Sequence, residues 1–187
     1  MAFSFDFVLK SGRAVCYPVL KGTFERGDEI YSDLQDQSAF YKAHVIAWVQ
    51  DVSRSLDYLQ TRKDIVPDKF GYYGLSWGSA MAPVVCAIEK RFKAAVLHVG
   101  GLMMEKTFPE VDVFNYLPHM QIPVLMLNGK NDTFYPYETS QKPMFNLIGT
   151  DAKDKKMIVY EGGHLVPRSE LMKESLSWFD KYLGTVK

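Results

Sequence analysis

The pattern of hydrophobic and polar residues along the chain alternates between two kinds of segment. Short continuous apolar runs, rich in β-branched and aromatic residues, are separated by longer stretches in which apolar residues recur every three or four positions. The short runs are typical of strands buried on both faces, and the longer stretches of helices that pack one face on a core. We therefore predict an α/β fold: a three-layer α/β/α sandwich around a mostly parallel sheet of about five strands.

The same pattern predicts where these elements lie. Strands are predicted at residues 14–19, 70–75, 94–99, 124–128 and 156–160, and helices at residues 38–62, 77–89, 137–148 and 170–183, with Gly184 as the last helix's C-cap. A chain of 187 residues, 47% of them hydrophobic, is long enough for one core and short for two. We expect residues 1–187 to form a single domain.

Composition and charge limit the kinds of partner, location and cofactor that are expected. Lys plus Arg and Asp plus Glu both total 22, so no net charge favours nucleic acid or an anionic membrane, and a small-molecule partner is expected. No apolar run approaches the roughly 18 residues of a membrane span, and Asp6 stands where a secretory signal carries basic charge. Cys16 and Cys86 lie in apolar runs outside any zinc spacing, which favours buried free thiols and a cytoplasmic location. The sequence has no dinucleotide or phosphate-loop motif and no cluster of metal ligands, so neither a cofactor nor a metal is expected.

One candidate nucleophile stands between a predicted strand and a predicted helix. Ser76 lies in GLSWG, residues 74–78, directly after the strand at 70–75. A serine on so tight a strand-to-helix turn projects above the sheet, and small flanking residues are needed where strand and helix approach. The start of the helix offers backbone N–H groups to developing negative charge. The alternative is a glycine-rich packing turn.

Two further residues follow other strands. Asp132 lies in the loop after the strand at 124–128, and His164 lies between the last strand and the last helix. In isolation such an aspartate is usually part of a solvated turn. His44, His98 and His119 have positions that suit packing or the surface, whereas His164 has room to reach a ligand. Ligands of open parallel sheets bind beyond the carboxyl ends of the strands, where all three candidates lie.

The three residues occur in the order Ser, Asp, His, and at this point the chain resembles the α/β-hydrolase superfamily. GLSWG resembles its nucleophile elbow, LNGKNDTFYP its acid loop and YEGGHLVP its histidine loop. The flanking DKFGYYGLSWGSAMA and RFKAAVLHVGG resemble the dienelactone-hydrolase and prolyl-oligopeptidase-like branch, and the likeness runs from about Ala2 to Leu183.

This resemblance implies a serine hydrolase that cleaves carboxylic esters, with short acyl chains favoured because no long insertion forms a lid. Ser76 would attack the acyl carbonyl, His164 would move the proton, and Asp132 would orient the imidazole. The backbone N–H of Trp77 would be one oxyanion donor. The residues expected to line the substrate site, because they neighbour the triad in sequence, are Trp77, Phe134, Tyr135 and Leu165.

The start of the chain departs from the family pattern. FSFDFVLKSGRAVCYPV resembles the family's first helix and fourth strand, so its earlier strands and the loop with the second oxyanion donor have no counterpart here. Two hypotheses follow. The segment 14–19 pairs directly with the strand at 70–75 and brings Gly22 in as the second donor, or an exposed strand edge pairs with a second copy to form a homo-oligomer.

Two other functions compete with an esterase. A peptidase of the prolyl-oligopeptidase-like branch fits the elbow region equally well. A hydrolase core that has lost its chemistry and serves as a binding or assembly subunit fits the missing oxyanion loop.

Overall fold

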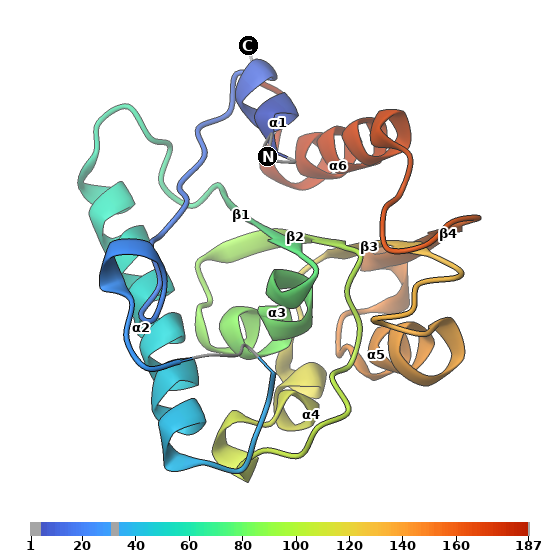
Figure 1. The fold of residues 1–187 in the computed structure, drawn as a ribbon. Coiled ribbons are helices and arrows are strands. Elements are labelled where there is room, and N and C mark those ends of the chain that lie inside the picture. The colour runs from blue at the N-terminus through green and yellow to red at the C-terminus, as the bar shows by residue number, and fades with distance from the viewer. Residues whose placement is uncertain (1–4, 31–33, 187) are drawn as a thin grey trace.

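A parallel sheet forms the centre of the fold. A computed structural model describes residues 5–30 and 34–186. The sheet has four strands in the order β1-β2-β3-β4, and each neighbouring pair is parallel (Figure 1). The strands are β1 (Phe70–Leu75), β2 (Phe92–His98), β3 (Val124–Gly129) and β4 (Lys155–Tyr160). β2 and β3, with apolar neighbours on both faces, are almost wholly buried, as the predicted strands of an α/β fold should be.

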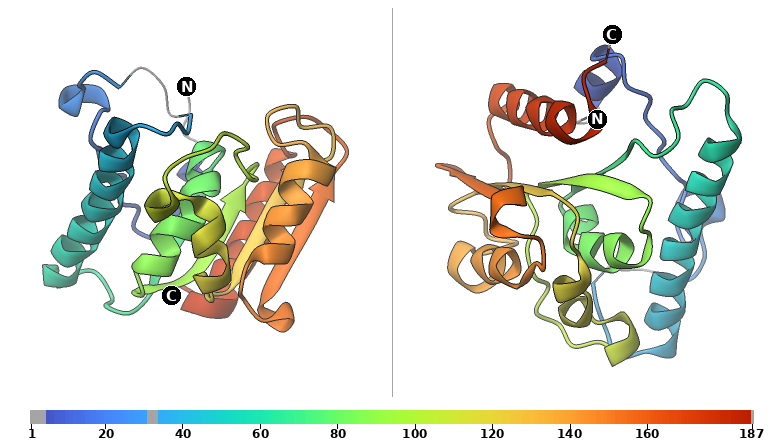
Figure 2. Two further views of the ribbon diagram at one scale, coloured as in Figure 1. Left: turned by 90° about the horizontal axis from the view of Figure 1, so that it is seen from below. Right: turned by 180° about the vertical axis from the view of Figure 1, so that it is seen from behind.

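Helices cover both faces of this sheet, which confirms the three-layer prediction (Figures 1 and 2). On one face lie α1 (Asp6–Lys10) and α6 (Arg168–Leu183), and on the other lie α3 (Trp77–Ile88), α4 (Val113–Tyr116) and α5 (Lys142–Leu147). The long helix α2 (Ala39–Thr61) packs outside α3, on the β1 side of the sheet. Each face has its own apolar core. None of the described helices combines the length and apolar character that crossing a membrane requires.

The ends of the helices follow the signals in the sequence. Ser38 caps α2 because its hydroxyl accepts the backbone N–H of Tyr41 at 2.9 Å. Gly184 ends α6 with a φ of 87°, a conformation that glycine adopts without steric cost. The helix predicted at residues 137–148 is divided: it begins as a π-helical turn, Tyr137–Gln141, and only then continues as α5.

The predicted first strand is wrong, so the sheet has four strands and not five. Among the described residues β1 pairs with β2 alone, and residues 14–19 belong to no strand or helix. The stretch is held elsewhere: the Val19 carbonyl accepts from the Arg26 side chain at 2.7 Å, and the Asp51 carboxylate on α2 accepts the Lys21 N–H at 2.9 Å. The direct pairing of residues 14–19 with β1 is therefore wrong, and pairing of this edge with a second copy stays a prediction.

The two cysteines differ in exposure. Cys86 is buried in α3, as predicted, whereas Cys16 is exposed because it belongs to the stretch that never enters the sheet.

Candidate active site

The turn between β1 and α3 holds Ser76 in a strained backbone conformation. Ser76 has a φ of 51° and a ψ of −111°, outside the regions that an L-residue prefers. A Cβ atom on Gly74 would lie 2.6 Å from the carbonyl carbon of Gly78, so glycine is required there. At Gly78 a Cβ atom would meet nothing closer than the Tyr72 hydroxyl at 3.9 Å. The predicted need for small flanking residues therefore holds at Gly74 but not at Gly78.

Hydrogen bonds to the end of β2 support this turn. The Ser76 N–H donates to the His98 carbonyl at 2.8 Å, and the buried Ser79 hydroxyl lies 2.9 Å from the same oxygen and 2.7 Å from the Gly74 carbonyl. A Cβ atom on Gly100 would lie 2.1 Å from the Ser79 Cβ atom, so the chain after β2 passes directly against α3. The turn that carries Ser76 is thus held from both sides.

The loop after β3 presents a buried carboxylate. Asp132 is 3% exposed. Its Oδ1 accepts the backbone N–H groups of Phe134 at 2.9 Å and Tyr135 at 3.2 Å, an arrangement that closes a tight turn. With Oδ1 held by the loop itself, Oδ2 is left to face the next loop.

That next loop follows β4 and is joined to the acid loop by backbone contacts. The Lys130 N–H donates to the Tyr160 carbonyl at 2.9 Å and the Asn131 N–H to the Gly162 carbonyl at 2.8 Å. A Cβ atom on Gly129 would lie 1.8 Å from the Gly163 carbonyl oxygen, so this approach is possible only for glycine. The two loops act as one unit.

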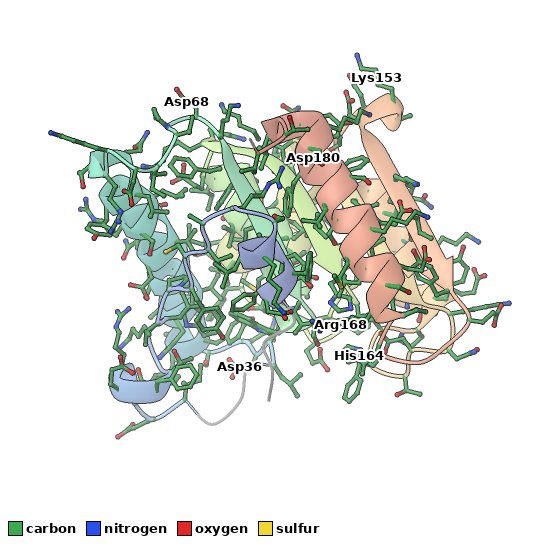
Figure 3. The ribbon with its side chains drawn as sticks, turned by 90° about the horizontal axis from the view of Figure 1, so that it is seen from above. Asp36, Asp68, Lys153, His164, Arg168 and Asp180 are labelled. Carbon is green, nitrogen blue, oxygen red and sulfur yellow. The ribbon has the colours of Figure 1, made fainter. Side chains whose placement is uncertain are left out.

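These contacts bring the three candidate residues into one hydrogen-bonded chain. His164 Nε2 lies 2.9 Å from Ser76 Oγ, and His164 Nδ1 lies 2.8 Å from Asp132 Oδ2. Because a carboxylate only accepts, a neutral His164 carries its proton on Nδ1 and leaves Nε2 to accept the serine proton. Figure 3 shows His164 beside Arg168, at the end of the fold where α6 begins. Each residue comes from the end of a different strand.

A second histidine lies beneath this chain. His98, the last residue of β2, is 2% exposed, and its Nδ1 lies 3.1 Å from the Tyr73 hydroxyl. Burial, and then the positive charge of His164, lower the pKa of His98 to about 4. His98 is therefore neutral at physiological pH, and its place in the core agrees with the packing role that the sequence suggested.

Of the two residues expected to donate to an oxyanion, Trp77 adjoins Ser76, whereas Gly22 lies in a separate turn. Trp77 is the first residue of α3, directly after Ser76, and its ring lies 4.9 Å from that of Trp48 on α2. Gly22 lies in a turn held to α2, because the indole N–H of Trp48 donates to the Lys21 carbonyl at 2.7 Å. The Gly22 N–H itself donates to the Arg26 carbonyl at 2.9 Å. In this arrangement Gly22 has no N–H left to offer an oxyanion.

Aromatic side chains contact the imidazole, and the exposed Leu165 follows it in the chain. Phe134 and Leu165 are 74% and 72% exposed, and the Phe134 ring lies 4.8 Å from that of His164. Tyr135, which the sequence analysis placed beside the triad with Phe134, stacks against the same imidazole with its ring centre at 6.1 Å.

The stretch after β2 mostly belongs to the core. Met103 is buried and Phe108 and Tyr116 pack against the core, whereas Met104 and Phe114 are exposed. Packing against the core therefore accounts for Met103, Phe108 and Tyr116.

Comparison with known proteins identifies the family. A sequence model described as "Serine hydrolase (FSH1)" matches residues 21–176. The chain belongs to this serine hydrolase family. A solved cold-adapted esterase from an Arctic intertidal metagenomic library is 28% identical, with a TM-score of 0.60 over 75% of this chain. The acylaminoacyl peptidase of Pyrococcus horikoshii, 15% identical with a TM-score of 0.61 over 76% of this chain, shares the fold.

The match to the serine hydrolase family covers more of the chain than the match to an individual Bacillus protein. The Bacillus subtilis (strain 168) protein YtaP is 40% identical over 48 residues, which are 26% of this chain and 16% of YtaP. The chain spans 59% of the esterase and 29% of the peptidase. It therefore covers less than two thirds of each of these three relatives.

Proposed function

We propose that this serine hydrolase cleaves carboxylic esters through Ser76, His164 and Asp132. The observation that carries the proposal is the continuous hydrogen-bonded chain from Ser76 Oγ through the imidazole to Asp132, with distances of 2.9 and 2.8 Å. Both lie within the reach needed for proton transfer, and the serine lies at the positive end of α3.

The reaction follows from the donors and acceptors. Ser76 Oγ attacks the acyl carbonyl as its proton passes to His164 Nε2, and the imidazolium is stabilised by Asp132. The imidazolium then protonates the departing alcohol, which leaves an acyl-serine. Water attacks the acyl-serine by the same route and restores Ser76.

The charge on the carbonyl oxygen needs donors of its own. The N–H of Trp77 follows the nucleophile at the start of α3 and is the first donor in the proposal. Trp77, Phe134 and Leu165 are the proposed substrate contacts. The exposed rings and chains of Phe134 and Leu165 favour an apolar acyl or alcohol group beside His164.

Ester chemistry is proposed ahead of peptide chemistry because a solved relative of 28% identity is an esterase. The likeness to the acylaminoacyl peptidase concerns the fold alone. A peptidase is therefore the second candidate function.

The test compares the 187-residue chain with its Ser76→Ala variant on p-nitrophenyl esters from acetyl to dodecanoyl, and on an acyl-aminoacyl anilide. We expect ester turnover with an optimum at short chains, and a loss of at least about 10³-fold in kcat for Ser76→Ala. Faster turnover of the anilide than of every ester would favour the peptidase. Equal background rates in both proteins would overturn catalysis and favour a binding subunit.

A further inference from the structure

We propose that Gln141 is a positioning residue of this active site, one that holds the acid loop closed so that Asp132 faces His164. This inference rests on the proposed function, because it assigns a role within the same site. It adds a residue that touches neither Ser76 nor His164 among the described contacts. The sequence analysis did not single it out.

The side-chain amide of Gln141 closes the acid loop from behind. Its Nε2 donates to the Gly129 carbonyl at 2.8 Å and to the Tyr135 carbonyl at 2.7 Å. These two residues lie on either side of Asp132, three positions away in each direction. One amide group therefore fixes the distance between the two ends of the turn that carries the carboxylate.

The orientation of this amide follows from its partners. Both partners are carbonyl oxygens, which only accept hydrogen bonds, so the NH₂ group and not the oxygen must face them. Gln141 is 0% exposed, and its Oε1 has no hydrogen-bond partner among the described residues. Burying an unpaired acceptor is unfavourable. The two hydrogen bonds that the amide donates to the Gly129 and Tyr135 carbonyls offset this cost.

The backbone is arranged to bring Gln141 to this place. The Gln141 N–H donates to the Pro136 carbonyl five residues earlier, at 3.3 Å, which is the bond of a π-helical turn. The turn contains one more residue than an α-helical turn would. This widening sets Gln141 at the junction with α5, behind the acid loop, and π turns of this kind are frequent at functional sites.

The contacts of Asp132 show how the effect would reach the imidazole. Tyr135 has its N–H on Asp132 Oδ1 and its carbonyl on Gln141, so the same residue links the carboxylate to the amide. Gly129 is equally linked, since it also approaches the Gly163 carbonyl of the histidine loop. Loss of the Gln141 amide would loosen the turn at both ends and let Asp132 move away from His164 Nδ1.

The variant that tests this is Gln141→Met, which keeps the length of the side chain and removes both donors. We expect kcat for ester hydrolysis to fall at least tenfold while KM changes less than threefold. KM should change little because the proposed substrate contacts, Trp77, Phe134 and Leu165, are not altered.

Thr150→Val is the matched control. Thr150 is also buried, and its hydroxyl also lies within hydrogen-bond distance of two backbone carbonyls, those of Met120 and Ile122. These two residues precede β3, at the end of the strand away from Asp132. Its kcat should stay within twofold of the parent.

A double-mutant cycle separates positioning from general support. If Gln141 acts through the carboxylate, Gln141→Met should lower kcat less than twofold once Asp132→Asn has been introduced. An equal loss in both backgrounds, or a Gln141→Met kcat within twofold of the parent, would overturn the proposal.

A measurement without substrate keeps this test apart from that of the esterase. The proton between His164 Nδ1 and Asp132 should give a downfield ¹H NMR signal that is absent from Asp132→Asn. We expect that signal to shift or vanish in Gln141→Met and to persist in Thr150→Val. An unchanged signal in folded Gln141→Met would refute the positioning role even if the chain hydrolyses no ester. If the chain hydrolyses no ester, loss of the signal in Gln141→Met but not in Thr150→Val would support the role.

Discussion

The two sides of the candidate active site differ in how completely the fold supports them. On the proton-transfer side, Ser76, His164 and Asp132 come from the ends of three strands that pair in one sheet, and the hydrogen bonds between them are short. On the side proposed to bind the oxyanion, called here the oxyanion side, Trp77 stands at the start of α3, but the N–H of Gly22 is already donated to the Arg26 carbonyl. The residues of the first side follow strands that pair in the sheet, whereas residues 20–23 follow a stretch outside it.

This difference shows what a parallel sheet can position by itself. Strands paired in register place their carboxyl ends side by side, so the loops that follow are neighbours whatever their sequences. Residues 20–23 follow a stretch that pairs with no strand in the described part of the chain. They are held by local bonds such as Gly22 N–H to the Arg26 carbonyl, and by contacts to α2 such as the Trp48 indole on the Lys21 carbonyl. Side-chain contacts of this kind fix a position less strongly than a ladder of backbone hydrogen bonds.

The largest expected effect comes from separating the two loops of the proton-transfer side. Gly129→Ala would place a Cβ atom 1.8 Å from the Gly163 carbonyl oxygen, which the backbone cannot accommodate without moving. We expect a loss of more than about 3 kcal/mol in the free energy of unfolding, measured by urea denaturation.

Gly163→Ala is the control for that variant, since nothing lies within 4 Å of a Cβ atom there. Its free energy of unfolding should be unchanged or raised by less than about 1 kcal/mol. Equal losses in the two variants would mean that the loops do not approach as closely as described.

The sequence predicted the proton-transfer side well for a physical reason. Strand periodicity placed β1, β3 and β4 to within one residue at each end, and Ser76, Asp132 and His164 each follow one of them. Chain order, the tight glycine turn and the resemblance to α/β hydrolases then grouped them. No tertiary contact of this chain had to be known.

The parts that were not predicted all depend on pairing or on distant contacts. An apolar run such as residues 14–19 is a strand only if another strand meets it, and local pattern does not reveal that. The role of Gln141 depends on a π turn and on carbonyls of the neighbouring loop, for which a single glutamine in a helical pattern gives no signal. Gly78 matches the elbow motif without having its steric need.

The next effect concerns the histidine beneath the proton-transfer side. His98 has a folded pKa near 4 against a reference of 6.5, so its contribution to stability is complete above pH 6.5 and is lost as pH falls toward 4. That difference corresponds to about 3 kcal/mol at the acid end. Chemical denaturation at pH 7 and pH 4 should show a parent that loses about this much more stability than His98→Asn. A parallel pH dependence in both proteins would refute a neutral buried His98.

A smaller effect is expected on the oxyanion side. Trp48→Phe removes the indole N–H that donates to the Lys21 carbonyl, while an aromatic ring remains near Trp77. We expect a loss of about 2 kcal/mol and a fall in kcat/KM of less than tenfold. Trp178→Phe is the matched change on α6, because the Trp178 indole N–H has no hydrogen-bond partner among the described residues. It should cost less, and the opposite order of the two losses would show that the turn is not held by Trp48.

The smallest effect separates the two kinds of contact that join the acid and histidine loops. Lys130 and Glu161 form an ion pair at 2.8 Å across these loops, yet their side chains are 56% and 77% exposed. Water and salt screen such a pair, so Glu161→Gln should change the free energy of unfolding by less than about 0.5 kcal/mol and leave kcat unaltered. A loss of 2 kcal/mol or more in the free energy of unfolding would mean that the ion pair, and not the backbone, joins the loops. We expect otherwise, because the N–H groups of Lys130 and Asn131 already donate across the same gap, where the Gly129 backbone excludes any side chain.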